Sequence, residues 1–232
     1  MSGRGAWVSI WVHPRETIRR IVTENKKRSL WLLASIYGFS SLLSCFQSFS
    51  LGSVVGAVSI FILALIFAPI WGYIAFAFWS FVVSWTGKWF KGVADFQSVR
   101  AAYAWSCVPL AVSDLIWVMM LVLFGASLFM APPSGQIFPQ GQTVVLLTLL
   151  FGKVILSIWS LVIYVNALAE VQKFSILRAI GNIVIAGILV GIVIGVLSIL
   201  SMYIIGAPIE ESPANAAFQM LQEGRFLYLQ TI

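Results

Sequence analysis

The sequence predicts an all-α polytopic membrane protein with five transmembrane helices and short interfacial helices. Of its 232 residues, 60% are hydrophobic and only 9% are charged. An ordinary soluble domain has about 25% charged residues, so water is not the main solvent of this chain. Five apolar runs are each near or above the ~20 residues that a helix needs to cross the hydrocarbon. They cover residues 29–49, 53–85, 105–130, 143–168 and 180–206.

The basic residues predict the orientation of these spans. Of the fourteen Lys and Arg residues, seven precede the first span, three lie between positions 88 and 100, and two lie between positions 173 and 178. Lys and Arg are enriched in cytoplasmic loops. We therefore expect a cytoplasmic N-terminus and a C-terminus outside, which agrees with an odd number of spans.

Residues 1–28 are predicted to form a cytoplasmic segment with an amphipathic helix. Pro14 suits a first helical position, and Ile18, Ile21 and Val22 follow at helical spacing. Such a helix would lie on the membrane surface, with its basic residues near anionic lipid headgroups. The alternative is a solvated basic leader that only fixes orientation. Residues 29–206 would then form the transmembrane domain, and residues 207–232 a non-cytoplasmic tail with a short helix.

The second apolar run is too long for a straight crossing. As one helix it would extend ~50 Å. We expect it to bend or break near Pro69. The segment 131–142 is uncharged and rich in Pro and Gly, which predicts a turn.

A Phe-x-x-x-Arg-Ala pattern occurs twice, starting at Phe96 and at Phe174. Each copy is expected to enter the next span without a break. The Phe rings would lie in the interface while Arg100 and Arg178 stay with the headgroups. The two copies suggest a duplication that matches spans two and three to spans four and five. The alternative is chance, because interfacial helices share these requirements.

Asp114 and Lys153 are the ionisable residues well inside the apolar runs. Each would cost roughly 2.5–3.5 kcal/mol at mid-membrane, so partners or a water-filled cavity are expected. We favour a structural ion pair, since the Lys stem can reach toward a neighbouring helix. The alternatives are a transport or proton-relay site and a lysine that extends alone to the interface. Asn166 is expected to hydrogen-bond between helices or at a helix end.

Gly187, Gly191 and Gly195 are spaced four residues apart in the last span. This pattern allows another helix to approach closely. The partner could be a helix of the same chain or of a second copy, which would make a homo-oligomer.

The sequence argues against an enzyme, a cofactor and a metal site. His13 is the one histidine, the spans contain one aspartate, and no phosphate-binding motif is present. Cys45 and Cys107 lie in or beside apolar spans and suggest neither a disulfide nor a zinc site. Nucleic acid is not expected as a partner, because the basic residues lie at span ends rather than on one polar face.

Several motifs resemble the prokaryotic branch of the Yip1 family. They are the W-x-x-P-R-E-T-I-R-R-I-V-x-E-N-x-K-R pattern (11–28), the G-K-W-F-K-G-x-x-x-F loop (87–96), the R-A-x-x-[AG] patterns at Arg100 and Arg178, and Ala104-Trp105-Ser106 before Pro109. The resemblance implies five spans and a cytoplasmic N-terminus. It also implies that eukaryotic members act in the secretory pathway, associate with Rab GTPases and with one another, and shape membranes. The chain lacks the D-L-x-G-P motif before the first span, so a prokaryotic cell (inner) membrane is its expected location.

Two functional hypotheses follow. The first is non-enzymatic membrane organisation, scaffolding or recruitment of an unidentified protein partner through the cytoplasmic loops. The alternative is a small transporter, channel or lipid-moving protein that uses Asp114, Lys153 and a helix break at Pro69. A continuous polar cavity would favour transport, whereas a dry, packed bundle would favour the scaffold.

Overall fold

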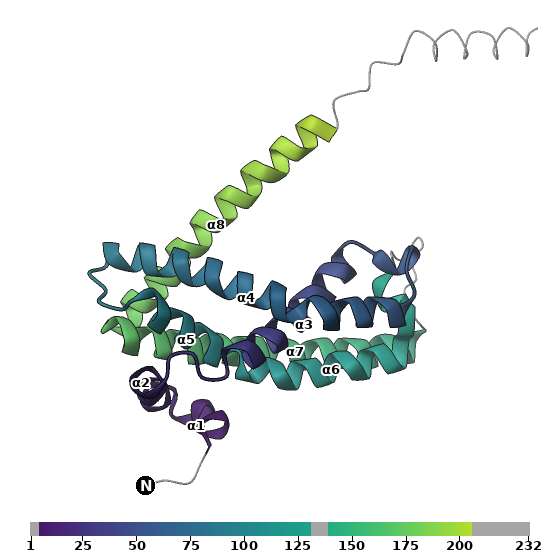
Figure 1. The fold of residues 1–232 in the computed structure, drawn as a ribbon. Coiled ribbons are helices and arrows are strands. Elements are labelled where there is room, and N and C mark those ends of the chain that lie inside the picture. Colours follow the sequence, from purple (N-terminus) through teal and green to yellow (C-terminus); the bar gives the residue numbers. More distant parts are fainter. Residues whose placement is uncertain (1–4, 131–138, 206–232) are drawn as a thin grey trace, which may run out of the picture. The chain divides into compact units, whose positions relative to one another are not determined.

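The structure, a computed structural model, describes residues 5–130 and 139–205 and confirms the all-α fold (Figure 1). In this part of the chain every regular element is an α-helix or a short 3₁₀ helix. The elements are α1 (Ala6–Val12), α2 (Pro14–Glu24), α3 (Leu30–Ser48), η1 (Leu51–Ser53), α4 (Ala57–Trp89), α5 (Phe96–Ser106), α6 (Val108–Phe124), η2 (Gly125–Phe129), α7 (Gln140–Gln172) and α8 (Ile176–Ile205).

The chain divides into two compact units, Met1–Ala186 and Gly187–Ile232. The described part of the second unit is the later portion of α8, and the contacts discussed below belong to the first unit. Most of the predicted turn at 131–142 and the whole of the predicted tail helix after residue 206 lie outside the described residues.

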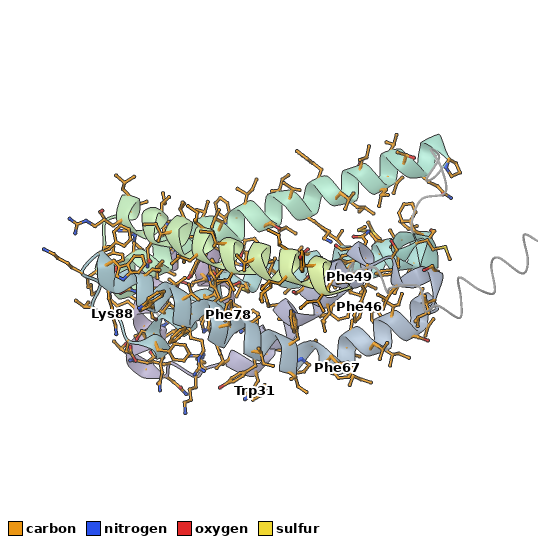
Figure 2. The ribbon with its side chains drawn as sticks, turned by 90° about the horizontal axis from the view of Figure 1, so that it is seen from above. Trp31, Phe46, Phe49, Phe67, Phe78 and Lys88 are labelled. Atoms are coloured by element: carbon orange, nitrogen blue, oxygen red, sulfur yellow. The ribbon has the colours of Figure 1, made fainter. Side chains whose placement is uncertain are left out.

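Five helices are long and apolar enough to cross a membrane, as the sequence predicts. They are α3, α4, α6 with η2, α7 and α8. Many of their large apolar side chains are exposed, as lipid contact requires. Figure 2 shows such side chains projecting from the helices, with Phe67 and Phe78 labelled on α4 and Trp31 at the start of α3.

α4 is helical from end to end with Pro69 inside it, so the helix is not broken there, while a bend at Pro69 stays a prediction. A proline removes one backbone donor, and the helix on either side must hold its position by packing. Ala68 and Gly72 provide that packing, because both lie directly against α3.

The α3–α4 crossing is close enough to exclude a side chain. A Cβ at Gly38 would lie 2.0 Å from the carbonyl oxygen of Ala68, and a Cβ at Gly72 would lie 1.8 Å from the carbonyl oxygen of Ala34. Each helix therefore presents an Ala and a Gly four residues apart, which is the small-residue spacing of close membrane-helix contacts. The sequence predicts such a contact at Gly187, Gly191 and Gly195, but not at these positions.

Two clusters of buried apolar side chains form the core of the first unit. One includes Trp105 and Phe76 together with residues of α1 and α2. The other, between α3, α4, α6 and η2, includes Trp117 and Phe129, whose rings stack with centroids 6.1 Å apart. The N-terminal helices are thus part of a core rather than separate from it.

The expected continuous helix after Phe96 is interrupted, because α5 ends at Ser106 and α6 begins at Val108. Pro109 has no N–H to donate to the carbonyl of Trp105. The chain makes a tighter turn instead, in which the Cys107 N–H donates to the carbonyl of Ala104 at 3.1 Å. From α7, the Ser160 hydroxyl donates to the carbonyl of Ser106 at 2.7 Å and so satisfies a backbone group that the break exposes.

Candidate functional site

Most charged side chains of the described residues gather at one end of the first unit. We call this the basic end and define it as α2, the α4–α5 connection (90–95) and the α7–α8 connection (173–175). The two connections are joined through Gln172, whose backbone carbonyl accepts from the Val93 N–H at 3.4 Å and whose side-chain oxygen accepts from the Ala94 N–H at 3.1 Å. They therefore form one surface.

α2 is fixed to α7 by two polar contacts. Arg15 Nε donates to Asn166 Oδ1 at 3.1 Å, and Arg19 Nε donates to Glu170 Oε1 at 2.8 Å. The partners are four residues apart on both helices, so α2 and α7 run in the same direction. Lys173 Nζ also binds Glu170, at 2.9 Å.

The apolar face of α2 packs on protein rather than on lipid. Ile18 and Ile21 are completely buried, as is Ile10 of α1. The Trp7 ring packs against Trp105 with centroids 5.6 Å apart. The apolar face of α2 is thus covered by protein, while its position at the membrane surface stays a prediction. The apolar face of an amphipathic helix can pack on any apolar surface, and here that surface is formed by α5 and α7.

The start of α5 is tied to the N-terminal segment. Lys26 Nζ lies 3.0 Å from both carboxylate oxygens of Asp95, and the Ser98 hydroxyl donates to the same carboxylate. Partial burial opposes ionisation of this group, but the hydrogen bonds from Ser98 and Lys26 outweigh it and lower the pKa of Asp95.

Arg100 is buried, which contradicts its predicted place among the headgroups. It is 8% exposed, donates to the Tyr73 hydroxyl at 3.2 Å, and lies over the rings of Tyr73 and Phe96 at 5.4 and 5.2 Å from their centroids. Trp31 stacks on Tyr73, with centroids 4.7 Å apart. The rings thus shield a guanidinium that no carboxylate of the described residues pairs with.

The second copy of the pattern is arranged the other way round. Arg178 is exposed, as predicted, whereas Phe174 is 9% exposed and packs against Phe90 with ring centroids 6.2 Å apart.

Asp114 and Lys153 lie near enough to interact electrostatically, but they form no direct ion pair. Asp114 accepts a hydrogen bond from the Ser40 hydroxyl of α3. The Lys153 ammonium lies over the Trp117 ring, 3.5 Å from its centroid. Each charge therefore has its own partner, and the coupling between the two stays a prediction.

Asn182 is a buried polar residue that was not predicted from the sequence. It is 0% exposed, its side-chain oxygen accepts from Thr86 at 2.6 Å, and its amide donates to the carbonyl of Val83 at 3.2 Å. The sequence signal for this contact is a polar Asn that follows Gly181 inside an apolar run. The contact attaches the start of α8 to the end of α4.

Some predicted features are not decided by these contacts. Gly187, Gly191 and Gly195 lie in the second unit, so their packing face stays a prediction. Asn166 does make the predicted contact between helices, with Arg15. Within residues 5–130 and 139–205, no three His, Cys, Asp or Glu side chains gather so that they could hold a metal ion.

Comparison with known families decides the relationship that the motifs suggested. The Yip1 domain matches residues 8–206, which is most of the chain. The protein belongs to the Yip1 domain family. No curated protein and no solved structure matches it. The Yip1 domain match includes α2 and all but the first two residues of α1, so the docked N-terminal helices are part of the family's domain.

Proposed function

We propose that this Yip1-domain protein is a non-enzymatic scaffold of a prokaryotic cell membrane. In this proposal the basic end faces the cytoplasm and recruits a protein partner. The observation that carries the proposal is the docking of α2 on α7 through Arg15 and Arg19, which gives the basic end a fixed surface. A preformed surface is what recruitment requires, because ordering it at each binding event would cost affinity.

The outer side of α1 and α2 contains a polar groove of about 330 Å³. The Thr17 and Ser9 hydroxyls, 2.7 Å apart, form its floor, and exposed Glu16 and Arg20 stand at its edge. Acidic and basic groups side by side suit a partner with complementary charges of both signs.

The interior of the first unit supports a scaffold rather than a channel. The Tyr103 ring packs against those of Tyr37, Phe76 and Tyr164, with centroids 5.9, 5.2 and 5.1 Å apart. Aromatic rings at these separations are in contact. They fill the space between α3, α4, α5 and α7 with packed rings, as expected for a scaffold.

A small transporter is the second candidate. Asp114 and Lys153 favour it, since both are only partly buried and are not paired directly with each other. Ionisable groups placed in this way are common in transport pathways.

Photo-crosslinking in the native membrane tests recruitment. A photoreactive residue replaces Arg20, and a matched one replaces Leu147, an exposed apolar residue of α7. We expect a discrete crosslinked product at position 20 that Glu16→Lys removes, and none at position 147. Equal products at the two positions would contradict the proposal.

Flux and lipid-scrambling assays in proteoliposomes test the alternative. The scaffold predicts rates equal to those of empty vesicles for both the wild type and Lys153→Met. Transport that depends on Lys153 would replace the scaffold with the second candidate.

A further inference from the structure

We propose that one anionic glycerophospholipid binds in the groove between α7 and α8, with its phosphate on Arg15 and one acyl chain along the groove. The inference goes beyond the scaffold function and does not depend on it.

The groove is a defined apolar cavity of the first unit. Its volume is about 390 Å³, within the ~300–1,000 Å³ of ligand pockets. Its walls include Val162 and Val165 of α7 and Ile180, Ile183 and Val184 of α8. All of them are hydrocarbon side chains, so the groove suits an acyl chain.

The one polar residue of the lining, Asn166, is the groove residue of α7 nearest to the basic end. Its amide donates to the carbonyl of Val162 at 2.9 Å, and this fixes the side chain so that its oxygen accepts from Arg15. An arginine head is therefore held at the end of an apolar groove.

Arg15 has donors to spare and, unlike its neighbour Arg19, has no carboxylate partner among the described residues. Arg15 uses Nε for Asn166, and its Nη groups have no hydrogen-bond partner among the described residues. Arg19 is paired with the carboxylate of Glu170. A planar guanidinium with free N–H groups matches the oxygens of a phosphate.

The surrounding charge selects an anionic headgroup over a zwitterionic one. The cations here are Arg15, Arg19 and Lys173. The carboxylates near them are Glu170, which binds Arg19 and Lys173, and Glu16, which interacts electrostatically with Arg19, so one positive charge is in excess. A zwitterionic headgroup would bring a further cation to this place, whereas an anionic one balances the excess.

Native mass spectrometry of the purified full-length chain tests the site, with phosphatidylglycerol and phosphatidylcholine as probes. We expect one phosphatidylglycerol to stay bound and to raise the melting temperature, with weaker retention of phosphatidylcholine. Arg15→Gln should weaken phosphatidylglycerol binding about tenfold, as loss of a charged hydrogen bond predicts. Arg20→Gln is the matched control, because Arg20 lies on the same helix but outside the groove between α7 and α8. This variant should bind phosphatidylglycerol like the wild type.

Ile180→Trp keeps the proposal falsifiable if Arg15→Gln fails to fold. Ile180 is 42% exposed on the opposite wall of the groove, so a larger side chain there fills the groove without touching Arg15. We expect it to abolish retention of the lipid. Unchanged binding in Ile180→Trp, or equal losses in Arg15→Gln and Arg20→Gln, would overturn the proposal, as would equal binding of the two lipids.

Discussion

The two Phe-x-x-x-Arg-Ala segments have the same sequence pattern and opposite environments. In the first copy Arg100 is buried and Phe96 is 36% exposed, whereas in the second Phe174 is buried and Arg178 is exposed. The alanine that follows the arginine is buried in both copies. The pattern therefore determines one packed position, and the neighbouring helices determine which of the other two side chains is covered.

The neighbours explain the inversion. In the first copy, Tyr73 offers a hydroxyl and a ring to the arginine. In the second, Phe90 offers only a ring, which packs with the phenylalanine. The helices also continue differently, since α5 ends at Ser106 while α8 continues to Ile205. A shared ancestry of the two segments stays a hypothesis.

The largest expected effect comes from exchanging the phenylalanines for alanine. Phe174→Ala should lower the free energy of unfolding by about 3 kcal/mol, because it empties a buried ring site. Phe96→Ala should cost about 1 kcal/mol, since its ring is partly exposed. Denaturant unfolding in detergent micelles measures both, and equal losses would contradict the inversion.

The arginines should show the reverse order. Arg100→Ala should cost about 2 kcal/mol through the lost hydrogen bond and ring contacts. Arg178→Ala should stay within about 0.5 kcal/mol of the wild type, as exposed positions usually do. The same unfolding assay applies. Arg100→Met separates charge from volume, and a stability equal to the wild type would show that the guanidinium contributes nothing beyond its bulk.

The shared alanines should behave alike. Ala101 is 1% exposed and Ala179 is 0% exposed, so a larger side chain would overpack both sites. Ala101→Leu and Ala179→Leu should each lower the melting temperature, with a loss of about 1–3 kcal/mol. A large loss in one copy alone would mean that the pattern does not fix this position.

The smallest effect concerns pH. Asp95 precedes the first copy, while Lys173 precedes the second. The lowered pKa of Asp95 means that its ionised form stabilises the folded state at neutral pH. This contribution is fully present above the unfolded-state pKa of about 3.9 and is lost as the pH falls through the lower folded-state value. Because the pair with Lys26 is partly exposed, the loss should be below about 1 kcal/mol.

The measurement is the difference in unfolding free energy between the wild type and Asp95→Asn at pH 7 and pH 3. We expect the difference to shrink at pH 3. A difference that does not change with pH would show that the carboxylate charge of Asp95 does not hold α5 in place.

The number and the approximate limits of the spans follow from the sequence, because hydrophobic length is a local property. The break at Cys107 does not follow from the sequence in this way, because it depends on the missing N–H of Pro109. The burial of Arg100 does not either, because it depends on Tyr73, a residue 27 positions away. The α3–α4 contact had a local signal in Ala34–Gly38 and Ala68–Gly72. The glycine triplet of the last span is more regular, so the sequence predicts a close helix contact there rather than between α3 and α4.

The docking of α2 on α7 also constrains the order of assembly. Arg15 and Arg19 bind partners 151 positions later in the chain. At about 5–20 residues per second, a ribosome takes roughly 8–30 s to add that length. During this interval the isoleucine face of α2 can pack on α5 but not on α7, so it stays incompletely covered. α2 is therefore made well before the helix that fixes its final position.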